Sequence, residues 1–386
     1  MTTVRVNQKG ASRAASGHPW IFRSDVTDSA GASAGETVHV AGPRGRLVGT
    51  AHYSTTSQIA LRLLDTRAVS FDRDFLRGRI TAAAAFRDRH VRDTSAYRLL
   101  YSEADLLPGL IADRYGDSIS VQFLNQGMDA AAGMIADVIE ELFHPQAIVA
   151  RNDAAVRAQE ALPREKKVLR GSLPERVTVS MNGLIWRCDL LEGQKTGIFL
   201  DQRENYVAAA EVARGDALDC FTSTGGFALH MARRCVRVEA VDSSAAALET
   251  ARANREANGI GNVEFREADV FNLLAGYAAG QRRFDTIVLD PPAFAKSRGA
   301  VEGALRGYRE INRRAIEILR PGGVLITNSC SHHVHEAMLL EAIAQASLDA
   351  GRMVRVLSRR TQAADHPIVL TIPETHYLKC LILEVA

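Results

Sequence analysis

The second half of the chain alternates short apolar segments with segments of helical periodicity, and this feature limits the fold more than any other. Strands that alternate with helices at such spacing predict a parallel, doubly wound α/β sheet. Ligands of these sheets bind beyond the carboxyl ends of the strands, so the residues that follow each strand are the most informative. The expected strands and helices, in chain order, are Ala217–Cys220, Phe227–Arg234, Arg237–Val241, Ala245–Asn258, Val263–Arg266, Thr286–Leu289, Leu305–Leu319 and Val324–Asn328.

The first half of the chain predicts two other modules. In residues 1–70, short strands separated by Gly and Pro indicate a small β-barrel, with strands at Val4–Val6, Thr37–Val40, Leu47–Tyr53 and Ile59–Leu64. Residues 71–175 indicate a central, EEHEE-like α/β module that begins with a helix from Phe71 to Val91 and ends in a linker at Leu169–Pro174. Its other elements are Tyr97–Tyr101, Gly109–Asp113, Ser118–Leu124, the helix Asp129–Phe143 and Ala147–Arg151. Residues 176–386 form the third domain, which is Rossmann-like.

Composition excludes several classes of protein. Hydrophobic residues make up 46% and charged residues 24%, and no apolar run reaches the length that spans a bilayer. The N-terminus lacks the apolar stretch of a secretory signal, so we expect a cytoplasmic protein without a membrane partner. The five cysteines show no paired spacing, which predicts reduced thiols and neither a disulfide framework nor a metal site.

Charge is distributed unevenly along the chain. The net charge is only +2, which argues against indiscriminate binding of polyanions. Residues 1–70 nevertheless hold eight Lys and Arg against four Asp and Glu. This local excess either faces phosphate groups or forms a mildly basic solvated surface, and charge alone leaves both alternatives open.

Glycines and acids follow the first three strands of the predicted sheet. Gly225 and Gly226 let the backbone approach a ligand closely, although a packing turn would use them too. Asp242 ends the second strand, where a carboxylate can accept both ribose hydroxyls. Asp269 can accept from an adenine amino group or cap the next helix. Together these residues predict S-adenosylmethionine as the cofactor, and the Gly-x-Gly-x-x-Gly dinucleotide pattern is absent. The candidate cofactor-binding residues of these loops are Phe221, Thr224, Gly225, Gly226, Phe227, Asp242, Ser243, Asp269 and Val270.

The order of motifs along nearly the whole chain resembles the ribosomal large subunit methyltransferase I family of class I methyltransferases. The motifs are His18–Phe22, Tyr53–Ile59, Asp105–Leu110, Lys195–Arg203, Thr224–Phe227, Asp290–Phe294, Asn328–Ser331 and Gln362–Pro367. The resemblance implies an N-terminal PUA RNA-binding domain, a central module and a C-terminal catalytic domain. It also implies an enzyme that makes 5-methylcytosine in 23S rRNA, free or in a precursor particle, and leaves a homodimer open. Ser223 and Ala293 depart from the family pattern, which often has Tyr and Lys there.

The resemblance further implies roles for single residues. Cys330 would add to carbon 6 of cytosine and so activate carbon 5 for methylation. Asp290 would hold the ring nitrogen or amino group of the base and border the cofactor. Gln202 and Arg203 would lie at the rim of the cofactor site with Phe199 and Asp201, where Arg203 either pairs with the methionine carboxylate or forms a structural salt bridge. The expected substrate-binding residues are Pro291, Pro292, Phe294 and His366.

Other interpretations stay open. The Asp290–Phe294 motif also resembles enzymes that methylate exocyclic amines of adenine or guanine, which would leave Cys330 idle. Cys330 could instead be a small core residue, the role that we expect for Cys220 and Cys380. A third alternative is an RNA-binding assembly protein without turnover, which the acids after the strands argue against. The candidates for the proton acceptor are His332, His333, Asp365 and His366.

Overall fold

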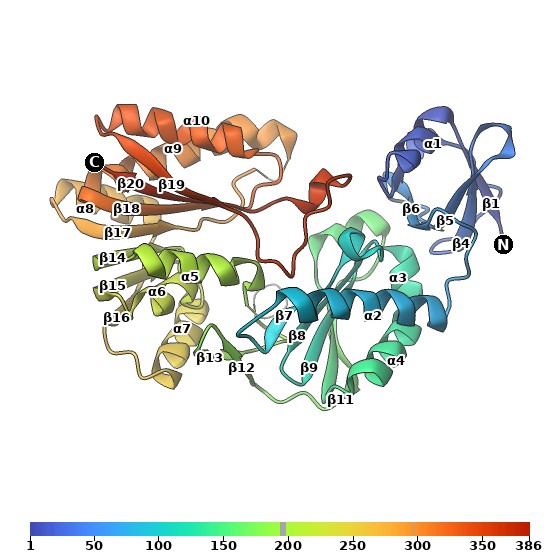
Figure 1. Cartoon of the computed structure of the whole chain (residues 1–386), viewed down its shortest axis with the longest axis horizontal. Coiled ribbons are helices and arrows are strands. Elements are labelled where there is room, and N and C mark those ends of the chain that lie inside the picture. The colour runs from blue at the N-terminus through green and yellow to red at the C-terminus, as the bar shows by residue number, and fades with distance from the viewer. Residues whose placement is uncertain (194–197, 296) are drawn as a thin grey trace. The chain divides into compact units, whose positions relative to one another are not determined.

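The computed structural model describes residues 1–193, 198–295 and 297–386. It contains two compact units, each made of more than one stretch of chain (Figure 1). The first unit comprises Met1–Ser180, Cys188–Ile198 and Ala364–Thr375, and the second comprises Met181–Arg187, Phe199–Ala363 and His376–Ala386. These units reflect which segments pack together, so the domain boundaries expected after residues 70 and 175 stay a prediction.

The N-terminal sheet of the first unit has six strands in the order β2-β6-β5-β4-β1-β3. They are β1 (Thr3–Val6), β2 (Trp20–Phe22), β3 (Val26–Asp28), β4 (Thr37–Ala41), β5 (Leu47–Tyr53) and β6 (Ile59–Asp65), with helix α1 (Gln8–Ala15) after β1. Alternate residues of β1 and β4 enter a common core, in which Val4, Val38 and Val40 are fully buried. The four predicted strands are confirmed. The elements α1, β2 and β3 escape prediction because each is only three to eight residues long.

The central part of the first unit is a five-stranded sheet in the order β11-β10-β9-β8-β7. Its elements are α2 (Arg73–His90), β7 (Ala96–Tyr101), β8 (Leu110–Tyr115), β9 (Ser118–Phe123), α3 (Gln126–Ala130), α4 (Ala132–Phe143), β10 (Ala147–Asn152) and β11 (Glu165–Gly171). The helices α2 and α4 pack beside each other and bury Leu76, Ile80, Ile135 and Ile139 in one core with the sheet. This arrangement gives the central part a core of its own.

One prediction for the central part is wrong. The segment Leu169–Pro174 is not a linker throughout, because its first three residues complete β11, which pairs antiparallel with β10. Lys166, Lys167 and Val168 of this edge strand are exposed, so the segment lacks the apolar alternation that marks a half-buried strand in the sequence. After it, β12 (Val177–Met181) and β13 (Leu184–Cys188) are joined by Asn182 and Gly183, both at positive φ, as a tight hairpin turn requires.

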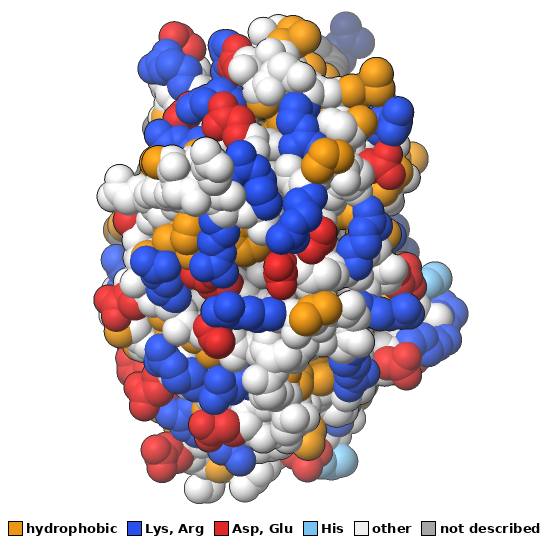
Figure 2. Space-filling model, turned by 90° about the vertical axis from the view of Figure 1, so that its left-hand side faces the viewer, with side chains coloured by type: hydrophobic (Ala, Val, Ile, Leu, Met, Phe, Trp, Pro, Cys, Tyr) orange, Lys and Arg blue, Asp and Glu red, His pale blue; other side chains and the backbone are white. Residues whose placement is uncertain are grey.

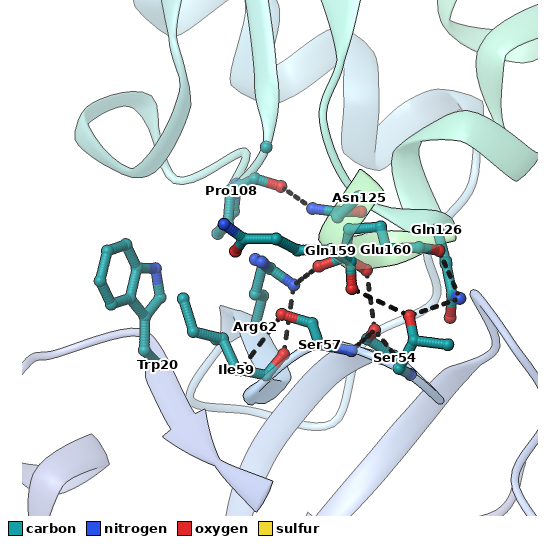
Figure 3. Close-up of polar contacts among 12 residues, drawn as sticks. Trp20, Ser54, Ser57, Ile59, Arg62, Pro108, Asn125, Gln126, Gln159 and Glu160 are labelled. Carbon is teal, nitrogen blue, oxygen red and sulfur yellow. Dashed lines mark hydrogen bonds and ion pairs between the residues drawn. The ribbon is translucent and has the colours of Figure 1, made fainter. Parts of the chain in front are cut away.

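A buried polar cluster joins the N-terminal sheet to the central part of the same unit (Figure 3). Glu160 ends the short helix η4 (Ala155–Glu160) and is fully buried. The Nη1 atom of Arg62 on β6 lies 2.8 Å from Oε1 of Glu160, and the Ser54 hydroxyl donates to Oε2 at 2.7 Å. Gln126 of α3 donates to the Glu160 carbonyl at 2.9 Å and accepts from the Thr55 amide at 2.9 Å. The two parts therefore share a desolvated ion pair as well as apolar contacts.

The second unit is built on a seven-stranded sheet in the order β16-β15-β14-β17-β18-β20-β19. Its elements are α5 (Arg203–Val212), β14 (Gly215–Cys220), α6 (Gly226–Met231), β15 (Cys235–Asp242), α7 (Ala245–Ala257), β16 (Val263–Glu267), α8 (Val270–Ala279), β17 (Phe284–Leu289), α9 (Val301–Ile318), β18 (Leu319–Ser329), α10 (Glu336–Asp349), β19 (Val354–Arg360) and β20 (Lys379–Val385). Strands β14 to β18 are parallel, and β20 runs antiparallel to both neighbours. The doubly wound sheet is thus confirmed, with an antiparallel addition at one edge.

The topology brings three loops together at the carboxyl ends of the strands. From β14 the chain proceeds through β15 to β16 and then returns to β17 on the other side of β14 (Figure 1). Cys220 at the end of β14 pairs with Leu289 at the end of β17, which pairs in turn with Thr327 of β18. Such a reversal of strand order opens a crevice at the carboxyl ends. Among the residues that the structure describes, no helix is both long enough and apolar enough to cross a membrane.

Candidate active site

The loop between β14 and α6 contains the two predicted glycines, and each has a structural reason. Gly225 has φ +93°, and Phe221 and Ser223 before it also lie at positive φ. A Cβ atom on Gly226 would lie 2.4 Å from Cζ of Tyr206, so only glycine fits there. The packing role that the sequence left open for these glycines is therefore present. Contacts of Phe221, Thr224, Gly225, Gly226 and Phe227 with a cofactor stay a prediction.

A buried acid that the sequence reading overlooked holds this loop. Oδ2 of Asp219 accepts from the Thr222 hydroxyl at 2.6 Å and from the Ala228 amide at 2.9 Å. Burial raises the pKa of Asp219 to about 7. The signal for this role is an acid inside an otherwise apolar strand, Ala217 to Cys220, directly before the glycine loop.

Asp242 ties the end of β15 to the same loop. Its Oδ2 accepts from the Ser223 amide at 2.9 Å, and its Oδ1 accepts from the Ser244 amide at 2.9 Å. Each carboxylate oxygen has a second lone pair, so these bonds orient the group without exhausting it. Acceptance of two ribose hydroxyls by Asp242 and contact of Ser243 with the cofactor stay predictions.

Asp269 is exposed and caps helix α8. Its Oδ1 accepts from the Asn272 amide at 2.9 Å, which confirms the capping alternative. Val270, the next residue, is buried in the core of the second unit. An additional bond from Asp269 to an adenine amino group stays a prediction.

Asp290 follows β17 and accepts the last hydrogen bond of a chain that begins at Arg360 and passes through Asn205 and Gln202. Nε of Arg360 donates to Oδ1 of Asn205 at 3.1 Å, because guanidinium groups only donate. The Asn205 amide nitrogen then donates to Oε1 of Gln202 at 2.7 Å, and Nε2 of Gln202 donates to Oδ1 of Asp290 at 3.0 Å. The cation at the head of the chain fixes both amide orientations. Gln202, expected at the cofactor rim, is thus also a partner of the candidate catalytic acid.

Arg203 is almost fully buried at the start of α5. Its Nη2 lies 3.6 Å from Oε1 of Glu204, so the salt-bridge alternative has a partner. Pairing of Arg203 with a cofactor carboxylate stays a prediction. The first part of the Lys195–Arg203 motif, residues 195–197, lies outside the described residues.

The loops after β17 and β18 are tied to each other around Cys330. Nδ2 of Asn328 donates to the Leu289 carbonyl at 3.1 Å, and the Ala295 amide donates to Oγ of Ser331 at 3.2 Å. Ser329 donates to the Tyr308 hydroxyl at 2.8 Å, and the same hydroxyl lies 3.1 Å from Oγ of Ser331. Both serines are fully buried. Cys330 is therefore held between two fixed residues.

Cys330 differs from the other four cysteines in exposure. It is half-buried, whereas Cys188, Cys220, Cys235 and Cys380 are buried. Burial raises the pKa of the Cys188 thiol to about 12 and of the Cys235 thiol to about 11, and it also raises those of Cys220 and Cys380. The core assignment of Cys220 and Cys380 is confirmed. Cys330 is not a fully buried core residue.

The residues of the Asp290–Phe294 motif divide between packing and surface. Pro291 is buried and Pro292 is exposed. The Phe294 ring lies 4.8 Å from the Tyr308 ring and 6.1 Å from the Phe271 ring, measured between centroids. Phe294 therefore packs on two aromatic neighbours, and its contact with a base stays a prediction.

A buried lysine beside Cys330 was not anticipated from the sequence. Lys379, the first residue of β20, is 3% exposed and pairs with Ser329 across the sheet. Its Nζ donates to the carbonyls of Ser331 and Tyr377, both at 2.8 Å. Burial lowers the pKa of Lys379 to about 8, while the nearby charges of Cys330 and Glu336 act in the opposite direction. The signal is a single lysine at the head of an apolar strand, Lys379 to Val385.

The two expected proton acceptors on the Gln362–Pro367 motif lie in the first unit. Nδ1 of His366 lies 3.1 Å from Oδ1 of Asp365, and its ring lies 5.4 Å from that of Tyr101. Oδ2 of Asp365 accepts from the Arg98 amide at 2.8 Å. Cys330 and Asp290 belong to the second unit, as does His332, whose ring stacks on Tyr377. The role of His366 toward the substrate stays a prediction. Within the described ranges, no three His, Cys, Asp or Glu residues are grouped so that they could hold a metal ion.

Two family models match the chain. A PUA-like domain matches residues 4–66, and an S-adenosylmethionine-dependent methyltransferase matches residues 150–369. The ribosomal RNA large subunit methyltransferase I of Shewanella denitrificans is 39% identical over 378 residues, and that of Shewanella amazonensis is 40% identical over 377 residues. Each alignment covers 95% of this chain and 95% of the relative.

Solved structures share the fold along the whole chain. A provisionally assigned S-adenosylmethionine-dependent methyltransferase from Streptococcus mutans has a TM-score of 0.85 at 20% identity, with 100% of both chains covered. A provisionally assigned methyltransferase in complex with SAH has a TM-score of 0.86, also at 20% identity. The PUA-like domain and the Rossmann-like methyltransferase domain are confirmed. With relatives near 40% identity over nearly its full length, the chain belongs to the ribosomal RNA large subunit methyltransferase I family of S-adenosylmethionine-dependent enzymes.

Proposed function

We propose that the protein methylates carbon 5 of a cytosine in 23S rRNA through a covalent bond from Cys330 to carbon 6 of the base. The observation that carries this proposal is the position of Cys330, a half-buried thiol between two fixed serines at the end of β18. Asp290 follows the neighbouring parallel strand β17, so an acid and a thiol follow adjacent strands of the sheet. Methylation of an exocyclic amine would need no thiol there.

The chemistry follows from the low nucleophilicity of carbon 5. Addition of the Cys330 thiolate to carbon 6 breaks the 5,6 double bond and moves its electron pair to carbon 5. Bound S-adenosylmethionine would supply an electrophilic methyl group to carbon 5 and leave as the neutral sulfide S-adenosylhomocysteine. Loss of the carbon 5 proton to a base then restores the double bond and expels the thiolate. The net change replaces one hydrogen of the ring by a methyl group.

Asp290 would hold the base while charge develops on the ring. Oδ1 of Asp290 accepts from Gln202. The carboxyl group can accept a further bond from the exocyclic amino group of cytosine or, when protonated, donate to the ring nitrogen. Asp242, oriented by two backbone amides, would accept from the ribose hydroxyls of the cofactor.

The test is trapping with RNA that carries 5-azacytosine at the target position. A ring nitrogen in place of carbon 5 prevents the final proton loss, so a covalent complex of protein and RNA should accumulate and survive denaturing electrophoresis. Cys330→Ala should remove both the complex and methyl transfer. Cys380→Ala, on the adjacent strand β20, is the control and should keep both, apart from a loss of stability.

Three outcomes separate this proposal from its rivals. Methyl transfer by Cys330→Ala at a rate close to that of the natural protein would favour amine methylation with Asp290 and Phe294. Absence of methyl transfer by the natural protein on rRNA and on precursor particles would favour an assembly protein. Bisulfite mapping of rRNA from a deletion strain should show one cytosine that loses protection, which would identify the target nucleotide.

A further inference from the structure

Lys379 is a buried ammonium group without a carboxylate partner. Two of its three N–H bonds point to the carbonyls of Ser331 and Tyr377. Within the described ranges, Nζ forms no ion pair with Asp or Glu, although the side chain is almost completely removed from water. Burying an unpaired charge costs several kcal/mol unless an opposite charge compensates it. The fold therefore retains a cation here at a cost that the carbonyl oxygens only partly offset.

The groups that face Lys379 identify what the cation can serve. Cys330 lies between two residues that contact Lys379. Ser329 pairs with Lys379 across the sheet, and the Ser331 carbonyl accepts a hydrogen bond from Nζ of Lys379. Glu336 on α10 also acts on Lys379, but its carboxylate already binds Arg359. The serines on either side of Cys330 bind the Tyr308 hydroxyl, and the ring of His332 stacks on that of Tyr377, whose carbonyl accepts from Lys379. The thiol is the one nucleophile among them that the proposed reaction uses.

We propose that Lys379 is a positioning residue that stabilises the thiolate form of Cys330. This inference rests on the proposed role of Cys330 as nucleophile. An ammonium beside a thiol favours release of the thiol proton to solvent, as at other reactive cysteines. Its hydrogen bond to the Ser331 carbonyl also fixes the backbone on one side of the thiol. No proton moves from Lys379 in this role, because the ammonium stays charged through addition and elimination.

The pH range of this effect follows from burial. The pKa of Lys379 is lowered to about 8, so the side chain is mainly charged at pH 7 and loses its proton as the pH rises through about 8. Lys379 therefore stabilises the thiolate fully at pH values well below 8, and this stabilisation is lost as the pH rises above about 8. Thiol and ammonium would titrate as a coupled pair rather than as independent groups.

The test measures the reactivity of Cys330 in the full-length protein without RNA or cofactor. Iodoacetamide alkylation of Cys330, followed by mass spectrometry of its peptide from pH 5 to 10, gives the midpoint of its titration. Lys379→Met keeps the length of the side chain and removes the charge. We expect it to raise the midpoint by about one pH unit, the lower end of the effect of a neighbouring opposite charge. The alkylation rate at pH 7 should fall only about threefold, because a thiolate of higher pKa is more nucleophilic.

A control separates charge from loop structure. Tyr308→Phe removes the hydrogen bonds to Ser329 and Ser331 without changing the charge, so it should leave the midpoint in place. A folded Lys379→Met protein with the midpoint of the natural protein would overturn the inference. The 5-azacytosine experiment would be unaffected by that result, so the two proposals fail independently.

A reciprocal measurement covers the case in which Lys379→Met does not fold. The chain has only six lysines, which makes their signals separable after incorporation of lysine labelled with ¹³C at Cε. Cys330→Ala removes the thiolate, so the NMR titration midpoint of Lys379 should fall relative to the natural protein. Because the interaction is reciprocal, this fall in the pKa of Lys379 should equal the amount by which Lys379 lowers the pKa of Cys330. An unchanged Lys379 midpoint would contradict the pairing.

Discussion

At the scale of single residues, the loop that begins the methyltransferase site depends on Asp219. This side chain is fully buried and receives hydrogen bonds from Thr222 and Ala228 on one oxygen. Burial raises its folded-state pKa from the ordinary value of 3.8 to about 7, because the charged form is poorly solvated. The folded protein therefore binds this proton more tightly than the unfolded chain does.

The consequence is a pH-dependent stability that Asp219→Asn should remove. Because its folded-state pKa is raised, protonated Asp219 contributes to the stability of the fold. This contribution is complete below pH 4, declines as the pH rises and is lost above about pH 7. Asparagine cannot ionise but can still accept from Thr222 and Ala228. The difference in unfolding free energy between variant and natural protein should thus change by up to about 4 kcal/mol in favour of the variant from pH 4 to pH 8. Urea unfolding at several pH values measures it, and a constant difference would contradict the buried acid.

The two acids of the cofactor loops should respond differently to substitution. Asp242→Ala removes a charged acceptor and two loop bonds, so calorimetry should show S-adenosylmethionine binding weakened by about 1.5–3 kcal/mol. Asp269→Asn keeps the cap of α8, since asparagine caps helices as well as aspartate does. A loss of affinity in Asp269→Asn with unchanged melting temperature would place its carboxylate on the cofactor. Unchanged affinity would restrict Asp269 to capping.

At the scale of elements, the ion pair between β6 and η4 fixes the N-terminal sheet to the central part of its unit. Arg62→Met leaves the fully buried Glu160 without its cation, which should cost about 3–5 kcal/mol in unfolding free energy. Glu160→Gln should cost a similar amount, because Arg62 then lacks its anion. The double variant should lose clearly less than the sum, since no unpaired charge remains. Additive losses would mean that the two charges do not depend on each other.

The elements also show how far sequence reasoning reaches. The segments Ile287–Leu289 of β17 and Val324–Ile326 of β18 are apolar and buried because both faces of the parallel sheet are covered, and this pattern is recognisable from the sequence. The edge strand β11 carries charged, exposed residues, so its sequence predicts a linker instead of a strand. Asp242, Asp290 and Cys330 could be placed because they lie at or directly after the ends of strands. Lys379 and the chain of hydrogen bonds from Arg360 to Asp290 could not be predicted from the sequence. Strand β20 joins the sheet from the C-terminus, and only strand pairing brings this strand beside β18.

At the scale of the whole molecule, many charged side chains lie in ion pairs. On the face shown in Figure 2, Lys and Arg side chains lie among Asp and Glu side chains. Many arginines are engaged in pairs, such as Arg237 with Glu264, Arg320 with Asp285 and Arg355 with Glu384. The basic excess of residues 1–70 is reduced by one charge, since Arg62 binds Glu160, which lies outside that range. Lys9 and Arg46 are among the exposed cations of this region and are candidates for phosphate contacts.

Lys9 and Arg46 provide the test of RNA binding by the PUA-like domain. The turn before β5 lies against α1, since a Cβ on Gly42 would lie 3.2 Å from that of Ala11, so the two cations share one region of the N-terminal sheet. If both contact phosphates, Lys9→Gln with Arg46→Gln should weaken binding of the rRNA target and lower the slope of log affinity against log salt by about 2, one for each contact. Arg89→Gln with Arg92→Gln changes the net charge equally at the end of α2 and is the matched control. Equal losses of RNA affinity in both double variants would indicate a general effect of net charge. An unchanged slope in the variant of Lys9 and Arg46 would mean that these two cations form a solvated surface and do not contact phosphates.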